Sequence, residues 1–249
     1  MPFLSSLSVR IRWIPQDDIL PPDTRPAFSS NVVEQFLHLI PGLTDQYIYM
    51  NDAYMIDRPT HPSDFFTKEH GVKLYLNQSQ VGFKNHGKGG SVWFSSLTNT
   101  IRVIEEAYGF TYQKTRFLEH LPYVFYKEAM YGVHRRFMGE LMFTSQNPQR
   151  GNMDMLVPYL HYAYVIHEGS HCCGLRWEIV DAKSAKEDAL LIHWTDDAKV
   201  NEKAVAEIEQ PLFLTVNDAM QEGTAEAVEQ LKTFYRERYG HLPATFERK

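Results

Sequence analysis

Two Asn-Asp pairs, each at the end of an apolar run, are the first residues in this chain that could do chemistry. Asn51 and Asp52 follow the strand-like run Tyr47–Met50, and Asn217 and Asp218 end a second apolar run. Open α/β sheets gather ligands and metals at the carboxyl ends of their strands. Carboxylate and amide oxygens suit Mg²⁺ or Mn²⁺, which could neutralise a substrate diphosphate. The alternative is that Asp52 caps a turn and that the second pair caps the C-terminal helix.

His120 and Arg150 could act on a phosphate group. His120 stands two residues before Pro122, and a proline at a first helical position predicts a helix that begins there. The imidazole could serve as a base or a nucleophile, and the helix N-terminus would favour a nearby phosphate. Arg150 precedes another expected helix, Met155–Ile166, and its guanidinium could hold phosphate through two parallel hydrogen bonds. The alternatives are a capping histidine and an ordinary surface arginine.

A further motif points to a different class of enzyme. His167, Glu168 and His171 satisfy H-E-x-x-H, in which two histidines bind Zn²⁺ and the glutamate acts as a general base. The Gly-Ser pair between them weakens the helix that this motif needs. Glu178 and Asp181 are the available third ligands, but they stand in no recognised third-ligand motif. A zinc metallopeptidase is therefore the competing hypothesis.

Composition limits the class of protein. The chain has 249 residues, 43% of them hydrophobic, and a formal net charge of -6. This length can form one large α/β domain, and the charge gives no reason to expect nucleic acid or an anionic membrane as a partner. The apolar runs are far shorter than the ~20 residues needed to cross a bilayer, and no signal peptide is visible. The two cysteines, Cys172 and Cys173, are adjacent, so a bridge between them would be strained and is not expected.

Both helices and strands are expected to position these residues. Asn31 and Glu34 have the spacing of a capping box, which predicts a helix that ends at Pro41. The strand that leads to Asn51 comes next. Residues 77–100 are polar and rich in glycine and are expected to form a mobile loop. A last helix is expected over Gln221–Tyr239.

Taken in order along the chain, these segments resemble the Stealth family. This chain has counterparts of five features of that family: the middle conserved region, the His-x-Pro that opens the next region, the Arg-x-x-x-Asp element, the last region and the usual ending. The matching segments are Phe28–Leu43, Tyr47–Asp52, Arg58–Pro59, Pro62–Phe66, His120–Tyr123, Arg150–Asp154, Thr215–Asp218 and Pro243–Glu247. The resemblance covers roughly residues 10–167 and 211–247, and its order makes it more specific than any single short motif.

The resemblance implies a sugar-1-phosphate transferase of the kind that builds capsule polysaccharide or phosphorylates glycans. Such an enzyme moves a hexose-1-phosphate from a nucleotide diphosphate sugar to a sugar hydroxyl, forms a phosphodiester, and uses Mg²⁺ or Mn²⁺. Its partners would be the nucleotide-sugar donor and a glycan acceptor. We expect the cytoplasm if the source is bacterial, and the Golgi lumen if the chain is part of a longer eukaryotic protein.

The fold that the resemblance implies is α/β, with a partial nucleotide-sugar (Rossmann-like) sheet and helical additions. Residues 1–249 would form a single domain, in which residues 1–110 are the partial nucleotide-sugar half and residues 111–249 the helical, acceptor half. The family's opening strand, of the type Ile-Val-Tyr-Thr-Trp-Val-Asp, has no counterpart here. The chain is therefore expected to begin about halfway through the nucleotide-sugar domain.

The resemblance also assigns roles to residues. The catalytic residues would be His120, Arg150 and Asp52. The substrate-binding residues would be Asn51, Glu34, Asp154, Asn217 and Asp218. The metal ligands would be Asp52 and Asp218. His120 would take the acceptor's proton or attack phosphorus itself, and the sequence leaves both open.

One departure bears on activity. The family's Asn-Asp-Asp reads Asn51, Asp52 and Ala53 here, so one carboxylate is missing from the expected metal site. Because a metal ion is less well neutralised by fewer carboxylates, this change is expected to weaken turnover. A non-catalytic, carbohydrate-binding remnant of the fold is the alternative that involves no enzyme.

Overall fold

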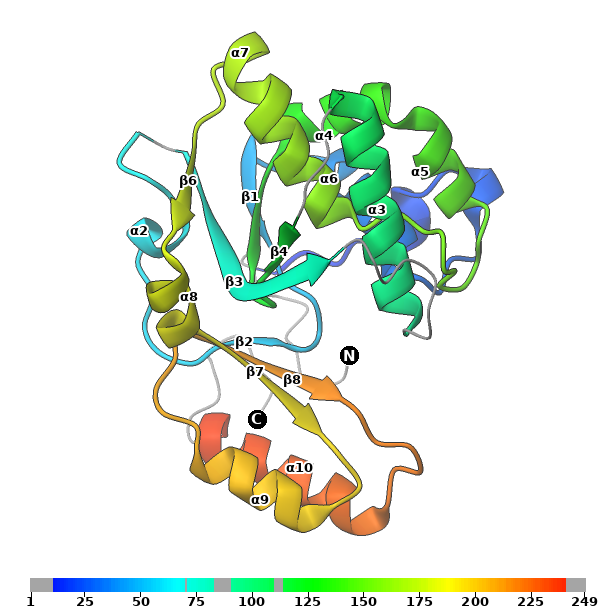
Figure 1. The fold of residues 1–249 in the computed structure, drawn as a ribbon. Helices are drawn as coiled ribbons and strands as arrows, with labels where there is room; N and C mark the ends of the chain where they lie inside the picture. Colours follow the sequence, from blue (N-terminus) through cyan, green and yellow to red (C-terminus); the bar gives the residue numbers. More distant parts are fainter. Residues whose placement is uncertain (1–10, 70, 83–90, 110–113, 241–249) are drawn as a thin grey trace.

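The computed structural model describes residues 11–69, 71–82, 91–109 and 114–240 (Figure 1). The helices are α1 (Ser30–Phe36), α2 (Pro62–Phe65), α3 (Val92–Tyr108), α4 (Lys127–Arg136), α5 (Met138–Ser145), α6 (Val157–Tyr164), α7 (Ser170–Cys172), α8 (Ala182–Asp188), α9 (Ala198–Ala206) and α10 (Ala225–Tyr239). The strands are β1 (Gln46–Tyr49), β2 (Tyr54–Ile56), β3 (Val72–Gly82), β4 (Lys114–Leu118), β5 (Tyr123–Tyr126), β6 (Trp177–Val180), β7 (Ala189–Trp194) and β8 (Phe213–Asp218).

Within the described ranges the strands form three small sheets, in the orders β1-β5, β2-β8-β7 and β4-β3-β6. Strands β7 and β8 are parallel, as are β3 and β6, and the remaining pairs are antiparallel. The α/β class is therefore confirmed. Strands β1, β2 and β3 all pair with strands that follow residue 110, so the two expected halves of the domain are joined strand to strand.

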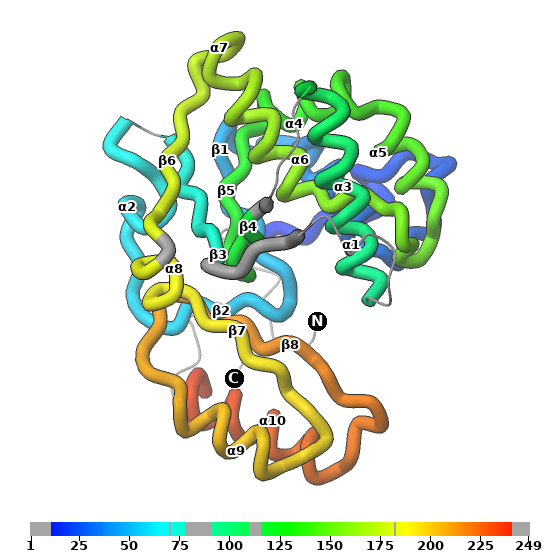
Figure 2. The backbone as a smooth tube through the Cα atoms, in the orientation of Figure 1, coloured from blue at the N-terminus to red at the C-terminus, as the bar shows by residue number. Residues whose placement is uncertain are grey.

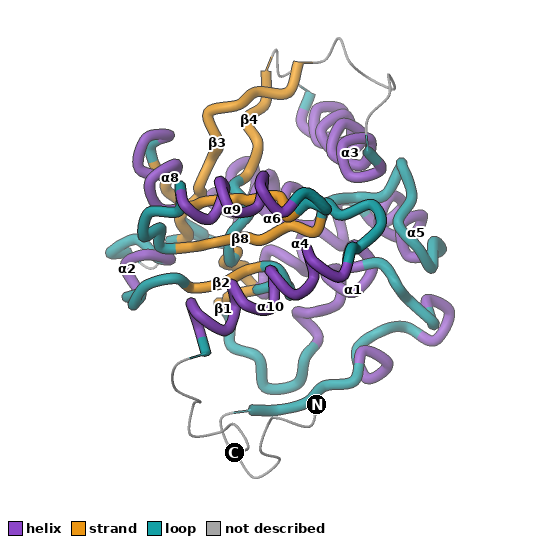
Figure 3. Tube along the Cα trace, turned by 90° about the horizontal axis from the view of Figure 1, so that it is seen from below, coloured by secondary structure: helices purple, strands orange, loops and turns teal. Residues whose placement is uncertain are grey.

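The sheet β2-β8-β7 forms a separate layer with α9 and α10 against one face (Figures 1 and 3). Trp194 of β7 and Phe234 of α10 are buried against each other, with their ring centroids 5.6 Å apart. The indole of Trp194 also donates to the carbonyl of Ala227 at 3.0 Å. This small core fixes β7 and β8, whose carboxyl ends carry candidate site residues.

The larger core lies around β5, which runs beside β1 (Figure 2). The expected helix at Pro122 is wrong, because the chain enters β5 there and α4 begins only at Lys127. Residues 123–126 are aromatic or β-branched and all are buried, and such a run favours a strand over a helix despite the proline. His120 therefore does not stand at the N-terminus of a helix.

The expected loop over residues 77–100 is also wrong where the structure describes it. Strand β3 continues to Gly82, and α3 begins at Val92 with Ser91 as its N-cap, whose hydroxyl accepts from the Phe94 amide at 3.2 Å. The glycines at 87, 89 and 90, and the segment 243–247, lie outside the described residues.

Two further expectations can be compared with the structure. Cys172 and Cys173 are joined by a disulfide bond, contrary to the expectation from their adjacency. In the described part of the chain, no helix combines the length and the apolar character needed to span a bilayer.

Candidate active site

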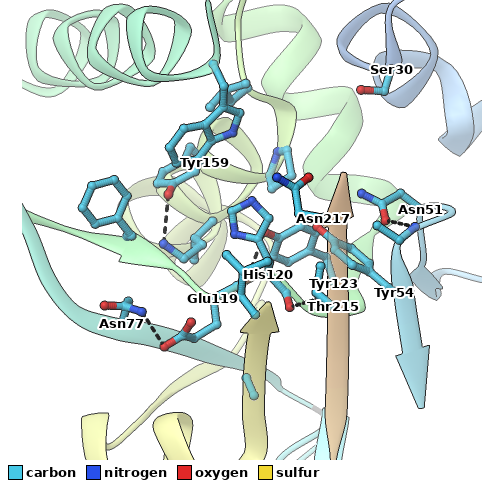
Figure 4. A pocket seen from close by; sticks show the side chains of 18 of the residues that line it. Ser30, Asn51, Tyr54, Asn77, Glu119, His120, Tyr123, Tyr159, Thr215 and Asn217 are labelled. Carbon is cyan, nitrogen blue, oxygen red and sulfur yellow. Dashed lines mark hydrogen bonds between the residues drawn. The ribbon is translucent and has the colours of Figure 1, made fainter. Parts of the chain in front are cut away.

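One cavity of about 880 Å³ brings together side chains that are far apart in the sequence. Its walls include residues of α1, the turn between β1 and β2, β3, the start of α3, the end of β4 and the residues after it, the loop before α6, α6, β7 and the carboxyl end of β8. Six of the residues singled out from the sequence line it, namely Glu34, Asn51, His120, Arg150, Asn217 and Asp218. Figure 4 shows His120 between Asn217 and Glu119.

The two Asn-Asp pairs meet because β2 and β8 are antiparallel. Tyr54 pairs with Thr215, and the Val216 amide donates to the Ala53 carbonyl at 3.2 Å, so the turn before β2 lies beside the end of β8. The Asn51 side-chain oxygen accepts from the Ala53 amide at 2.9 Å. This register explains how two separate strand ends contribute oxygen atoms to one wall.

Asp52 lies differently from its neighbours. It is exposed and does not line the cavity, whereas Asn51 and Ala53 do. Burial raises the pKa of Tyr235 on α10, and the negative charge of Asp52 raises it further. The Asp52 carboxylate therefore lies near Tyr235 of α10.

His120 is largely enclosed between two elements. Its carbonyl accepts from the Thr215 hydroxyl at 2.6 Å, and its ring lies 5.6 Å from the Trp93 ring between centroids. Burial lowers the pKa of His120, and the nearby His193 lowers it further. The imidazole is therefore neutral near pH 7 and can accept a proton or act as a nucleophile.

Arg150 and Glu34 meet at the α1 side of the cavity. The Arg150 guanidinium donates to the Ser30 hydroxyl at 3.1 Å and is otherwise open to solvent. Glu34 is buried and accepts from the Tyr49 hydroxyl at 2.8 Å. Burial raises the pKa of Glu34 to about 7, although Tyr49 and Arg150 oppose the shift. A carboxyl group that titrates near neutral pH thus lies beside the cation that would hold phosphate.

Asp154 has a different environment from the other predicted substrate-binding residues. It is fully buried and does not line the cavity. Its carboxylate accepts from the Asn147 side chain and from the Gly151 amide, both at 2.8 Å. These bonds close the loop that carries Arg150, so the position of Asp154 favours loop support over substrate contact.

The oxygen atoms that line the cavity suit a metal ion that is shared with a substrate. In the ranges that the structure describes, no group of three or more His, Cys, Asp or Glu side chains could hold an ion. Asp218 offers a carboxylate, and Asn51 and Asn217 offer carbonyl oxygens on the same wall. Mg²⁺ is commonly held by one or two carboxylates, water and substrate phosphates, so the set fits an ion shared with a substrate.

The H-E-x-x-H residues are occupied by other contacts. Glu168 accepts from the Tyr108 hydroxyl at 2.9 Å and pairs with Arg136 at 3.5 Å. The His167 ring stacks on Tyr108, and His171 is exposed beside Ser170. The described residues include no third ligand near them that completes a metal cluster. The zinc metallopeptidase hypothesis is therefore not favoured.

Sequence reasoning missed several residues that line the cavity, among them Asn77, Trp93, Glu119 and His193. The first two fell in the expected loop, and no element was predicted over the segment that holds His193. The alternation of Leu190, Ile192 and Trp194 in β7 could have signalled a strand that points His193 to the other face. Glu119 could have been noticed as a carboxylate next to His120.

Comparison with known proteins identifies two conserved regions. Residues 2–74 match the model for Stealth protein conserved region 2, and residues 119–167 match that for Stealth protein conserved region 3. The chain is 23% identical to a capsular polysaccharide phosphotransferase of Neisseria meningitidis serogroup A over 253 residues, which cover 96% of this chain and 43% of that protein. It is 25% identical to an exopolysaccharide phosphotransferase of Streptomyces coelicolor over 233 residues, covering 91% of this chain and 36% of that protein. The chain thus spans less than half the length of these relatives.

Proposed function

We propose that this chain, a member of the Stealth family through its conserved regions 2 and 3, is a sugar phosphotransferase. It would move a hexose-1-phosphate from a nucleotide diphosphate sugar to a hydroxyl group of a glycan and release a nucleoside monophosphate. The observation that carries this proposal is that His120, Arg150, Asn217 and Asp218 line the same cavity.

Binding of the donor would depend on the cations of the cavity. Arg150 can make two parallel hydrogen bonds to phosphate oxygens, and Lys186 is a second cation among the lining residues. Phosphoryl transfer depends mainly on positioning and on stabilising the charge of the equatorial oxygens. Arg150 would supply both, because its exposed guanidinium is held at one end by Ser30.

His120 would handle the proton of the acceptor. The acceptor oxygen forms a bond to the sugar-bearing phosphorus, the bond from that phosphorus to the nucleoside monophosphate oxygen breaks, and the hydroxyl proton passes to the neutral imidazole. In the alternative, the imidazole attacks phosphorus first and the acceptor then displaces it. Only the second route passes through an acid-labile phosphohistidine, so rapid quenching of a reaction with labelled donor separates them.

The proposed cofactor is Mg²⁺ or Mn²⁺, held by Asp218 and Asp52 together with the donor phosphates. When bound, such an ion would offset the negative charge of the diphosphate. Asp218 lines the cavity, and Asp52 stands in the chain between two residues that line it, Asn51 and Ala53. The protein would then have little affinity for the ion without the donor.

The proposal is tested by equilibrium binding of a panel of nucleotide diphosphate sugars, such as UDP- and GDP-sugars, with Mg²⁺ or Mn²⁺, followed by measurement of nucleoside monophosphate release. Arg150→Ala should weaken donor binding by roughly 10- to 100-fold, as expected for a lost charged hydrogen bond. His120→Asn should leave donor binding intact while release falls by at least 100-fold. Arg135→Ala, an exposed arginine of α4, is the matched control and should change neither. No binding across the panel would contradict the proposal for this chain.

A further inference from the structure

A second polar pair lines the cavity away from the expected phosphate site. Glu119 is 8% exposed, and its Oε1 accepts from the Asn77 side-chain amide at 2.9 Å. Among the described residues, no lysine, arginine or histidine forms an ion pair with Glu119, and no other donor reaches its carboxylate. The carboxylate therefore keeps acceptor capacity toward the cavity.

Both members of this pair are held by strand backbone. The Glu119 amide donates to the Tyr75 carbonyl at 2.9 Å, which continues the antiparallel pairing of Leu76 with Leu118. Asn77 is two residues along β3 from Tyr75, so it is the diagonal neighbour of Glu119 on one face. The register shifts just after this point, between Leu76 and Gln80, and such irregularities often re-aim side chains next to binding sites.

A purely structural role explains this pair poorly. Strands β3 and β4 are already joined by their backbone hydrogen bonds. Burial raises the pKa of Glu119, and the single bond from Asn77 only partly opposes the shift. The second Glu119 oxygen is not among the buried polar atoms that lack a partner, and Glu119 lines the cavity, so this oxygen is accessible to a ligand that supplies donors.

The position of the pair relates it to the reaction. Figure 4 shows Asn77 and Glu119 on one side of His120, with Asn51 and Asn217 on the other. If the donor phosphates occupy the side of Asn51 and Asn217, the acceptor hydroxyl must approach His120 from the opposite side. The acceptor would then pass Glu119.

An aromatic surface adjoins the same side of the cavity. Trp93 stacks on Phe117 with ring centroids 6.0 Å apart, and both residues line the cavity. The Trp93 ring also lies beside the His120 ring. A pyranose ring has an apolar face that packs on aromatic rings, and the Trp93–Phe117 surface suits this face. The ring also carries hydroxyl groups that need hydrogen-bond partners, and the Asn77–Glu119 pair suits these groups.

We propose that Glu119, held in place by Asn77, binds hydroxyl groups of the acceptor sugar, with the sugar ring against Trp93, and so directs one further hydroxyl to His120. The Glu119 carboxylate accepts from sugar hydroxyls, while the Asn77 NH₂ group remains on Glu119 and fixes its position. The proposal rests on the proposed function for the identity of the acceptor. Binding of the acceptor sugar at this subsite does not require a bound nucleotide sugar.

Disaccharide binding tests this subsite directly. The probes are maltose, chitobiose and mannobiose, titrated by calorimetry or NMR line broadening into the full chain without nucleotide. The wild-type chain should bind at least one of them, and Glu119→Gln and Asn77→Ala should each weaken that binding about tenfold or more. Glu202→Gln, an exposed residue of α9, is the matched control and should bind as the wild-type chain does.

Donor binding, measured in parallel, separates this inference from the proposed function. Both cavity variants should bind a UDP-sugar with Mg²⁺ as tightly as the wild-type chain, which also shows that they fold. Disaccharide binding unchanged in both variants, or absent from the wild-type chain, would overturn the subsite even if donor binding is normal. Disaccharide binding that depends on Glu119, in a chain that binds no nucleotide sugar, would support the subsite and contradict the transferase.

Discussion

Glu34 and His120 line the same cavity with their pKa values displaced in opposite directions. Burial raises the pKa of Glu34 to about 7, and burial lowers that of His120. Both shifts favour the neutral form, since each side chain loses water around its charge. Near pH 7 the imidazole is therefore free to take a proton, while Glu34 divides between its two protonation states. Environments that separate two titratable groups in this way are typical of acid–base sites.

Glu34 should make binding of the proposed donor dependent on pH. Below pH 7 Glu34 is largely protonated, and above pH 7 it carries a negative charge beside Arg150, where the proposal places the donor phosphates. Like charges repel, so the dissociation constant of a UDP-sugar should rise about fivefold between pH 6 and pH 8. Glu34→Gln should remove this pH dependence and keep the lower dissociation constant at both pH values. Titration calorimetry at several pH values tests it, and an unchanged pH dependence in the variant would assign the effect to another group.

Ala53 is the position at which the proposed metal site could be strengthened. It lines the cavity between Asn51 and Tyr54, at the position where the family's pattern has a second aspartate. Ala53→Asp adds a carboxylate to the wall that carries Asp218, so the Mg²⁺ concentration for half-maximal donor binding should fall about tenfold. Asp218→Ala should raise it. The idea fails if the added aspartate weakens donor binding at every Mg²⁺ concentration.

At the scale of elements, the contact between α4 and α6 depends on one glycine. A Cβ atom at Gly132 would lie 2.1 Å from Cζ of the buried Tyr164, so Gly132→Ala must displace the ring or separate the helices. Such overpacking should cost about 2–3 kcal/mol in the free energy of unfolding. Gly139→Ala on α5, where a Cβ meets nothing within 4 Å, is the control and should cost nothing measurable. Urea denaturation of both variants gives the comparison.

The elements that the sequence predicts well carry local signals. The apolar run before Asn51 marks β1. A helix is also expected where α1 lies, but its capping box is wrong, because the N-cap is Ser29, no side chain caps the helix, and α1 ends at Phe36. The errors arise where tertiary context overrides local signals. Pro122 suggests a helix start, yet burial of both faces makes the next residues β5, and the glycines after residue 82 conceal the start of α3 at Val92. Contacts such as that between Gly132 and Tyr164 have no local signal at all.

In the candidate site, too, the residues with local sequence signals could be predicted, and those brought together by tertiary contacts could not. Residues in short motifs after apolar runs, such as Asn51 and Asn217, could be singled out because strand ends are common ligand sites. Their meeting could not be predicted, because it depends on the antiparallel register of β2 with β8. Glu119 and Asn77 belong to no motif and become neighbours only through the pairing of β3 with β4.

At the scale of the whole molecule, the cavity is shared between two layers. Trp93 lies in α3 and His120 in the segment between β4 and β5, whereas His193, Asn217 and Asp218 come from the sheet that α9 and α10 cover (Figures 1 and 3). A long-range ion pair holds this sheet and α10 together, since Arg238 of α10 binds the Asp57 carboxylate just after β2. A ligand that contacts both layers should therefore stabilise the fold as a unit.

Ligand binding should accordingly raise the melting temperature, and most strongly with donor and metal together. At a donor concentration of 100 times the dissociation constant, binding adds about 2.7 kcal/mol, which corresponds to roughly 5–10 °C for a domain of this size. Mg²⁺ alone should change little, because the described residues offer no cluster of three metal-binding side chains. Asp218→Ala should abolish the increment that Mg²⁺ adds to the donor, whereas Glu202→Gln should preserve it. A full stabilisation by donor in the presence of EDTA would show that Arg150 and its neighbours hold the diphosphate without an ion.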